Sequence, residues 1–187
     1  MNVYDFDDTI YNGDSSKDFI LFEMKRHLGS FAKRCLPMCI STILYVLHIH
    51  TKETWKSSMF SFLKDISDIS GEIELFWDEH EKKIKSWYLK QQRQDDVVIS
   101  ASPAFLVKEA CQRIGVRHVI ATEMDKTSGK IYGKNCKGQE KEKRFRQCYG
   151  ENVVIGGFYS DDVSDQYMAS IAEKAYMVKG NNIEKWK

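Results

Sequence analysis

The sequence predicts an α/β fold, a doubly wound parallel sheet with a helical domain inserted after its first strand. Three observations lead to this prediction. Short apolar runs alternate with helical patterns from residue 97 onward, residues 14–92 contain no convincing strand, and residues 2–6 form an isolated apolar run before them. Strands that alternate with helices pair in parallel through right-handed crossovers. We therefore assign residues 1–13 and 93–187 to an α/β core and residues 14–92 to an inserted helical domain, the cap.

The individual elements follow from hydrophobic periodicity. Four helices are predicted in the cap, at 15–28, 31–49, 54–66 and 72–92, separated at Gly29, around Thr51 and at Gly71. Apolar runs in the core predict strands at 97–100, 117–121, 153–158 and 175–178, together with an extended segment at 131–133. Helical spacing between them predicts helices at 103–114, 140–149 and 165–174. This alternation is typical of a doubly wound domain.

Composition narrows the class of protein. The 187 residues carry 28 basic and 27 acidic side chains, a net charge of +1, so no global field favours a nucleic-acid partner. Five cysteines without disulfide or zinc spacing indicate free thiols in a reducing compartment. No signal peptide is apparent, and the longest apolar stretch, Leu36 to Ile49, is shorter than the roughly 20 residues of a membrane span. We expect a cytoplasmic protein of undetermined oligomeric state.

An acidic cluster, Asp5-Phe6-Asp7-Asp8-Thr9, stands at the end of the first predicted strand. Crowded carboxylates raise one another's pKa unless a cation neutralises them. A hard divalent ion such as Mg²⁺ prefers oxygen ligands of this kind. Taken alone, the cluster fits an acidic turn as well as a metal site.

A second acidic cluster, Ser160-Asp161-Asp162-Val163-Ser164-Asp165, follows the apolar run 153–158. On its own it fits a helix N-terminus with capping acids. However, parallel sheets place their sites at the carboxyl ends of their strands. The two acid-tipped strands are therefore expected to converge on a single metal ion.

Two further segments suggest an anion site. Ser100-Ala101-Ser102-Pro103 follows a strand, with Ser102 as a candidate N-cap and Pro103 at the first helical position. Free N–H groups at such a helix start bind anions, although a simple capped helix is the alternative. Lys141 begins another predicted helix, where a cation opposes the helix dipole, and this suggests an anionic partner. Lys143 is the alternative lysine.

Taken in order, these segments resemble the four motifs of the haloacid dehalogenase (HAD) superfamily of phosphatases. Asp5-Phe6-Asp7-Asp8-Thr9 is similar to the first motif, with Asp8 where glycine is usual. Ser100 and Lys141 match the second and third motifs. Asp161 and Asp165 match the fourth, with Ser160 in place of a glycine. The resemblance covers nearly the whole chain.

The cap resembles the helical type-one cap of the subfamily that contains phosphoserine phosphatases. Segments such as 135–141 and 159–162 look like the branch that includes the bacterial phosphatidylglycerophosphatase C. Ser100-Ala101-Ser102-Pro103 departs from the Ser-Gly-Gly of phosphoserine phosphatases, and Tyr11-Asn12-Gly13 lacks the acid that usually follows their first motif. Phosphoserine is therefore not the first expectation for the substrate.

The resemblance implies an Mg²⁺-dependent phosphomonoester hydrolase acting on a small phosphometabolite or a lipid phosphate. It implies that Asp5 is the nucleophile that becomes an aspartyl phosphate and that Asp7 is the general acid and base. A phosphate-binding or regulatory protein without turnover is the alternative. The remaining implied roles are metal binding by Asp5, Asp7 and Asp161, phosphate binding by Ser100, Ala101 and Lys141, and support by Thr9 and Asp165.

The predicted helix 31–49 is apolar on nearly every side. Such a helix is buried or contacts another apolar surface. One interpretation is a helix packed in the cap core, on the catalytic core or on a second subunit. The other is a peripheral membrane contact, because basic residues flank the helix at both ends.

Overall fold

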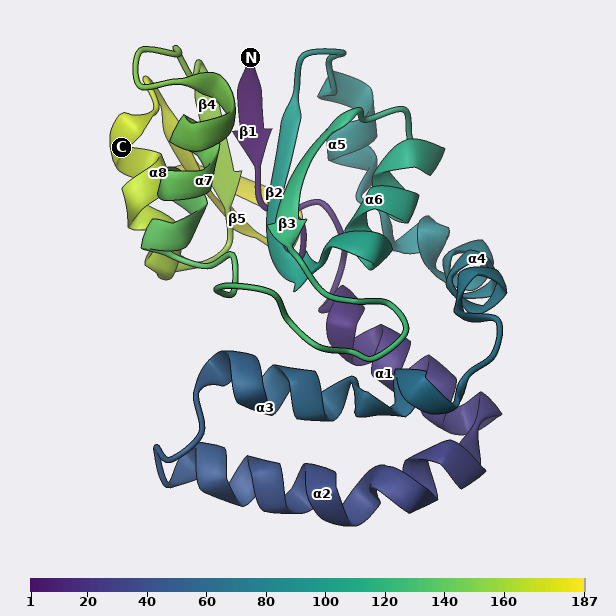
Figure 1. Cartoon of the computed structure of the whole chain (residues 1–187). Coiled ribbons are helices and arrows are strands. Elements are labelled where there is room, and N and C mark those ends of the chain that lie inside the picture. Colours follow the sequence, from purple (N-terminus) through teal and green to yellow (C-terminus); the bar gives the residue numbers. More distant parts are fainter. Residues whose placement is uncertain (187) are drawn as a thin grey trace.

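The computed structural model describes residues 1–186, which contain one six-stranded sheet in the order β3-β2-β1-β4-β5-β6 (Figure 1). The first five strands are parallel and the last is antiparallel to β5. The doubly wound α/β fold is therefore confirmed. The strands are β1 (Asn2–Tyr4), β2 (Val97–Pro103), β3 (His118–Thr122), β4 (Gly157–Ser160), β5 (Ala175–Lys179) and β6 (Asn182–Lys185).

Helices cover both faces of the sheet, and side-chain alternation along β2 explains why. Val98 packs in one buried cluster with residues of α5 (Ser86–Gln91) and α6 (Ala104–Arg113). Val97 and Ile99 point to the opposite face and pack with residues of α7 (Gln139–Tyr149) and α8 (Gln166–Ile171). A strand buried on both faces needs the continuous apolar run that the sequence shows.

The inserted segment begins with α1 (Ser15–Arg26), α2 (Leu28–Val46) and α3 (Lys52–Met59), which extend below the carboxyl edge of the sheet (Figure 1). Side-chain caps determine where two of them start. Asp14 accepts a hydrogen bond from Lys17 N, and Thr51 accepts one from Thr54 N. Capping of this kind satisfies N–H groups that have no partner within the helix.

The structure differs from several predicted element boundaries. The predicted helix 54–66 ends as a 3₁₀ turn at Ser61–Asp65, and the predicted helix 72–92 is divided into α4 (Ile69–His80), a 3₁₀ turn at Glu81–Lys83, and α5. The predicted strand 153–158 lies later, at β4. Strand β6 was not predicted because all four of its residues are exposed and it carries no apolar pattern.

The last helices of the inserted segment pack on the core domain. In α4, Trp77 Nε1 donates a hydrogen bond to the carbonyl oxygen of Leu106, 3.0 Å away. In α5, the ring of Tyr88 contacts Tyr4 edge-on, with 4.9 Å between centroids. One cluster of buried side chains continues from the sheet into these helices and on into the cap. The part that projects from the core is therefore α1 to α3, and the division at 14–92 stays a prediction.

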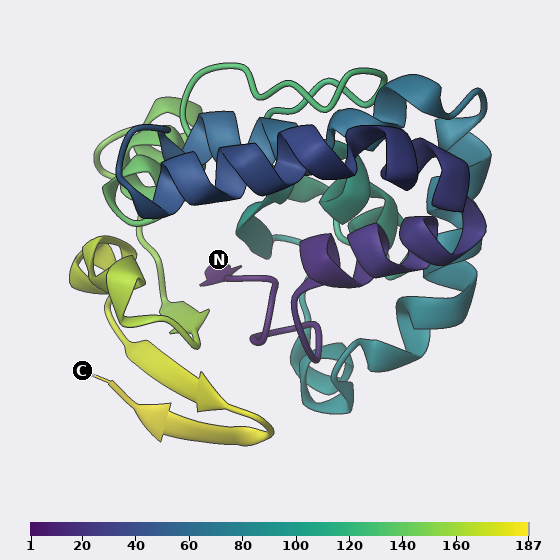
Figure 2. The same ribbon diagram turned by 90° about the horizontal axis from the view of Figure 1, so that it is seen from below.

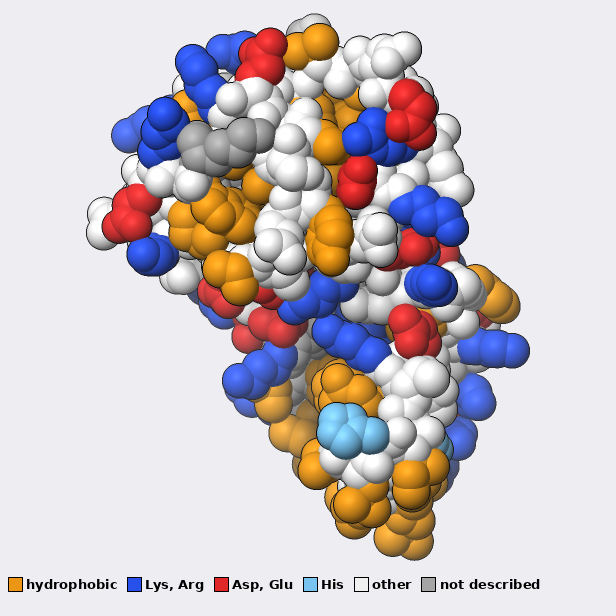
Figure 3. Space-filling view, turned by 90° about the vertical axis from the view of Figure 1, so that its left-hand side faces the viewer, with side chains coloured by type: hydrophobic (Ala, Val, Ile, Leu, Met, Phe, Trp, Pro, Cys, Tyr) orange, Lys and Arg blue, Asp and Glu red, His pale blue; other side chains and the backbone are white. Residues whose placement is uncertain are grey.

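Helix α2 carries an apolar surface that the rest of the chain leaves uncovered. Its inner side packs through Phe31 and contacts α3, but Leu36, Ile43 and Val46 are 69%, 59% and 68% exposed. Figure 2 shows α2 lying across the cap on the side away from the sheet, and Figure 3 shows hydrophobic side chains gathered at that end of the molecule. This outward surface is not part of a cap core. Within residues 1–186 no helix is long and apolar enough to span a bilayer.

Candidate active site

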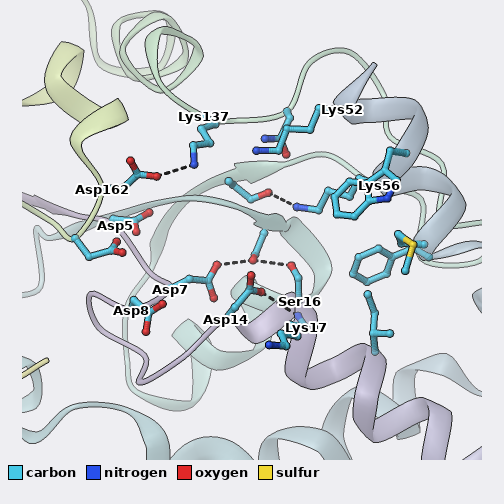
Figure 4. Close-up of a pocket in the computed structure, with 18 of the residues that line it drawn as sticks. Asp5, Asp7, Asp8, Asp14, Ser16, Lys17, Lys52, Lys56, Lys137 and Asp162 are labelled. Carbon is cyan, nitrogen blue, oxygen red and sulfur yellow. Dashed lines mark hydrogen bonds and ion pairs between the residues drawn. The ribbon is translucent and has the colours of Figure 1, made fainter. Parts of the chain in front are cut away.

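A cavity of about 560 Å³ lies between the carboxyl edge of the sheet and the cap (Figure 4). Residues from both acidic clusters reach it, although more than 150 positions separate them in sequence. Its core-side lining includes Asp5, Asp7, Asp8, Ala101, Ser102, Lys141, Asp161, Asp162 and Asp165. The convergence expected of the two strand ends is therefore observed.

Lys141 joins the two acidic clusters. Its Nζ atom donates hydrogen bonds to Asp5 Oδ1 at 2.5 Å and to Asp165 Oδ2 at 2.6 Å. Ser160 Oγ also donates to Asp165 Oδ2, at 2.8 Å. Burial opposes the charge on Lys141, but Asp5 and Asp165 outweigh burial and raise its pKa above the ordinary value. Lys141 is therefore a fixed cation beside Asp5. Lys143 is exposed and is not among the residues that line the cavity.

Both oxygens of Asp7 accept hydrogen bonds. Ser15 N donates to Oδ1 at 2.7 Å, and Ser102 Oγ donates to Oδ2 at 2.5 Å. Ser16 Oγ lies 2.7 Å from Ser102 Oγ and extends this network into α1. Burial and nearby Asp14 raise the pKa of Asp7 to about 6, although the bonds from Ser102 and Ser15 act in the opposite direction.

Ser102 is therefore not the N-cap of α6, contrary to the sequence prediction. Pro103 occupies the position before α6, and no side chain caps that helix. Strand β2 continues through an irregularity to Pro103, so the Ser102 hydroxyl faces Asp7 and not the helix start. Its contact with Asp7 was not predicted, because the local pattern Ser-Pro favours capping and the partner lies 95 positions away.

Thr9 connects the first and fourth motifs. Its hydroxyl is 3.5 Å from Asp5 Oδ2 and 3.3 Å from Asp161 Oδ1, and it accepts a hydrogen bond from Asp161 N at 2.9 Å. Burial and the neighbouring charge of Asp5 raise the pKa of Asp161 to about 7. Asp162 uses both of its oxygens elsewhere, with Lys137 Nζ at 2.6 Å and Ser164 N at 2.8 Å.

The end of β2 faces the cavity with its backbone more than with side-chain hydroxyl groups. Ser100 is fully buried, and its Oγ accepts a hydrogen bond from Ser102 N at 3.0 Å. Ala101 lines the cavity, and its carbonyl oxygen accepts bonds from Lys56 Nζ and Thr122 Oγ1, each at 2.7 Å. Of the predicted phosphate-binding residues, Ala101 and Lys141 thus line the cavity, while Ser100 supports the turn behind it.

Two residues outside the predicted set hold the first acidic loop. Asp8 adopts φ of 52°, a left-handed conformation that explains why glycine suits this position. Lys85 Nζ donates to the carbonyl oxygens of Asp8, at 2.5 Å, and Gly180, at 2.7 Å. Lys85 lies 77 positions after Asp8, so no local sequence pattern could have predicted this contact.

The cavity fits a divalent cation. Asp5 is buried, and burial raises its pKa even with Lys141 beside it. Asp165 Oδ1 is also buried and accepts no hydrogen bond within residues 1–186. Several carboxylates thus line one cavity around Lys141, and their oxygen atoms are the donors that Mg²⁺ prefers.

These features define the chain as a doubly wound α/β protein with an acid-lined site at the carboxyl edge of its sheet. A family model for haloacid dehalogenase-like hydrolases matches residues 3–170, so the chain belongs to that family. The resemblance predicted from the four motifs is therefore confirmed.

The individual proteins that resemble this chain have low sequence identity to it. Protein CicA of Caulobacter vibrioides is 24% identical over 193 aligned residues, covering 94% of this chain and 85% of CicA. A Bordetella pertussis Tohama I protein of unknown function has a TM-score of 0.74 at 19% identity, covering 94% of this chain and 87% of that one. Phosphoserine phosphatase, in its phospho-aspartyl intermediate analogue, has a TM-score of 0.56 at 19% identity, covering 92% and 83%. These solved structures share the fold of this chain.

Proposed function

We propose that the chain is an Mg²⁺-dependent phosphomonoesterase that forms an aspartyl phosphate on Asp5. The observation that carries this proposal is the arrangement of Asp5 and Asp7 in one cavity, with Lys141 hydrogen-bonded to Asp5. A nucleophile, an acid/base and a fixed cation are the parts that phosphoryl transfer to a carboxylate requires.

The residues divide the reaction between them. In the first step an Asp5 oxygen forms a bond to phosphorus, the ester P–O bond breaks, and Asp7 gives a proton to the leaving oxygen. In the second step Asp7 removes a proton from water as the water oxygen attacks phosphorus, which releases inorganic phosphate and restores Asp5. Ser15 and Ser102 orient Asp7 through their hydrogen bonds.

The cation and the lysine supply charge stabilisation. Mg²⁺ held by Asp5, the main-chain carbonyl of Asp7 and Asp161 would screen the repulsion between carboxylate and phosphate. Lys141 stabilises charge on the transferring oxygens together with the backbone at Ala101. Asp165 holds Lys141 in position through its 2.6 Å bond. Thr9 supports Asp5 and Asp161.

The cap side of the cavity supports a substrate with both charged and apolar parts. Lys52 and Lys56 stand one turn apart on α3 and line the cavity. Burial lowers the pKa of Lys56 to about 8. The apolar part of this lining is formed by Ile20 and Leu21 of α1 and by Trp55, Met59 and Phe60. A phosphomonoester with an apolar body fits this lining, whether it is a soluble metabolite or a lipid phosphate.

The exposed side of α2 supports a contact with a membrane surface. Its apolar stripe, formed by Leu36, Ile43 and Val46, is exposed, as is Leu21 of α1, which also lines the cavity. The basic flanks contribute less than their number suggests. Arg34 pairs with Asp65 at 2.9 Å, and Lys52 and Lys56 face the cavity, which leaves Lys25 and Lys33 exposed near the stripe.

The decisive test is hydrolysis of p-nitrophenyl phosphate by the full chain, with Mg²⁺ and with excess EDTA. We expect turnover that EDTA abolishes and added Mg²⁺ restores. Phosphate binding without turnover under any divalent ion would instead identify the non-catalytic alternative. A panel of soluble and lipid phosphomonoesters then identifies the substrate class. We expect slow hydrolysis of small, fully polar esters, because much of the cap lining is apolar.

A further inference from the structure

A second cluster of ionisable groups lies at the far corner of the cap, away from the proposed catalytic residues. Glu23 and His27 stand four residues apart, at the end of α1, and therefore share one helix face. Glu72 approaches from the first turn of α4. Within residues 1–186, these three are the group of His, Cys, Asp or Glu side chains whose potential ligand atoms all lie within 4.8 Å of one another.

Glu23 is the unusual member of this cluster. Its side chain is completely buried, yet neither carboxylate oxygen accepts a hydrogen bond within the described chain. His27 Nε2 lies 3.6 Å from Glu23 Oε2, and this nitrogen is also buried without a hydrogen-bond partner within residues 1–186. A buried carboxylate that accepts no hydrogen bond is costly, so a cation bound beside Glu23 would stabilise its ionised form.

Arg26 does not fill that role. Its guanidinium donates to Glu72, at 2.6 Å from Nε to Oε2 and 3.2 Å from Nη2 to Oε1, and makes no hydrogen bond to Glu23. Glu72 Oε1 is at the same time 3.2 Å from His27 Nε2. Arg26 thus fixes the position of Glu72 and leaves the space between His27 and Glu23 without a cation.

The distances match the edges of a metal tetrahedron. Zinc lies about 2.0–2.2 Å from imidazole nitrogen and carboxylate oxygen, so two ligand atoms of a tetrahedral site are roughly 3.3–3.5 Å apart. His27 Nε2 is 3.2 Å from one carboxylate oxygen and 3.6 Å from the other. His27 is 30% exposed as a whole, but its Nε2 atom is buried and faces the two glutamates.

We propose that Glu23, His27 and Glu72 form a Zn²⁺ site, with water as the fourth ligand. The site goes beyond the proposed function, because it joins the α1–α2 corner to α4 and none of its three side chains lines the catalytic cavity. A metal there would tie the end of α1 to the helix that packs on the core. Its effect is therefore on the stability of the cap.

The test is calorimetric titration of Zn²⁺ into the full chain. The background is Cys35→Ser with Cys39→Ser, because these exposed thiols on α2 could bind zinc, and saturating Mg²⁺ occupies the proposed catalytic site. We expect one Zn²⁺ per chain and a higher unfolding temperature with Zn²⁺. Glu23→Gln should weaken binding at least ten-fold, whereas Glu79→Gln, an exposed acid on the same helix as Glu72, should not.

Either of two results would overturn the proposal. Absence of binding at one site per chain, or equal affinity in Glu23→Gln and Glu79→Gln, would show that Glu23 is held as a neutral acid and that no metal occupies the corner. If Glu23→Gln does not fold, His27→Gln takes its place, because a half-exposed side chain tolerates the change. No phosphate ester is present in this experiment, so its failure leaves the proposed phosphatase activity untouched.

Discussion

The catalytic edge and the outer corner of the cap handle buried charge in opposite ways. At the edge, Asp5 and Asp165 share the ammonium group of Lys141, and Asp7 accepts two hydrogen bonds. At the corner, Glu23 is equally buried but has no hydrogen-bond partner within residues 1–186. Helix α2 follows that corner in the chain, and the rest of the described chain leaves its apolar stripe exposed.

This difference indicates how each region is completed. The edge is organised in advance by protein groups around the site proposed for substrate and cation, as expected where preorganised charges stabilise a reaction. The outer cap is physically incomplete within one chain, because a buried acid and an apolar stripe both carry a free-energy cost. We therefore expect mutations at the edge to affect catalysis and mutations in the outer cap to affect binding and stability.

The largest effect is expected for Asp5→Asn. An amide is a poor nucleophile, so kcat for p-nitrophenyl phosphate should fall by roughly 10⁴-fold or more, as when other covalent catalysts lose their nucleophile. Lys141 keeps its bond to Asp165, so the fold should remain intact. The measurement is steady-state hydrolysis beside circular dichroism. A folded variant with wild-type turnover would remove Asp5 from the role of nucleophile.

The next effect separates two nearby lysines of α7. Lys141→Ala should lower kcat by about 10²–10³-fold, since it removes a fixed cation from a water-poor site. It should also destabilise the fold by about 3–5 kcal/mol, because Asp5 and Asp165 lose their buried partner. Lys143→Ala is the matched control, and an exposed lysine should change neither quantity appreciably.

Equal losses in the two lysine variants would contradict the position assigned to the third motif. Lys141→Arg sharpens the test further. A larger guanidinium keeps the charge but does not fit the fully buried space between the two carboxylates, so turnover should recover only in part. Urea denaturation of each variant provides the stability comparison.

A smaller effect tests the outer corner through pH, in the presence of a chelator. Burial, with a contribution from Glu72, raises the pKa of Glu23 to about 8, above its unfolded value near 4.5. The unfolded chain releases this proton first, so stability is greatest below pH 4.5 and is lost as pH rises toward 8. Glu23→Gln should remove that loss. Thermal unfolding of both proteins from pH 5 to 8.5 measures the difference.

Asp7 and Asp161 also have raised pKa values, which gives a slope of the same sign, but both residues are present in wild type and variant. The difference between the two curves therefore reports Glu23. Parallel curves would mean that Glu23 is ionised in the folded protein at neutral pH.

The sequence predicted the catalytic edge better than the outer cap, and the reason is physical. Parallel strands deliver their carboxyl ends to one edge, so an apolar run followed by acids identifies Asp5 and Asp161 without knowledge of distant contacts. The roles assigned to these residues stay predictions. Contacts made across the fold carry no local signal, as with Ser102 at Asp7 and Lys85 at the carbonyl of Asp8.

The sequence predicted the helices of the cap but not which of their sides are exposed. An apolar helix pattern does not show which side is covered, and in α2 the uncovered side is the more apolar one. Glu23 and His27 fit an ordinary amphipathic helix in sequence. Only the approach of Glu72 from α4, 49 positions after Glu23, reveals a cluster.

The smallest effect is expected for the apolar stripe of α2. Ile43 is 59% exposed, so Ile43→Glu should leave the unfolding temperature and the hydrolysis of a soluble phosphate ester nearly unchanged. It should, however, reduce cosedimentation with anionic vesicles at low salt, because membrane affinity scales with the buried apolar area and with attraction to anionic lipid. Val154→Glu is the matched control, because it adds the same single negative charge at an apolar residue that is 61% exposed on a loop of the core. A wild-type chain that stays in the supernatant and sediments as a dimer would assign the stripe to a second subunit, and Ile43→Glu would then yield monomers.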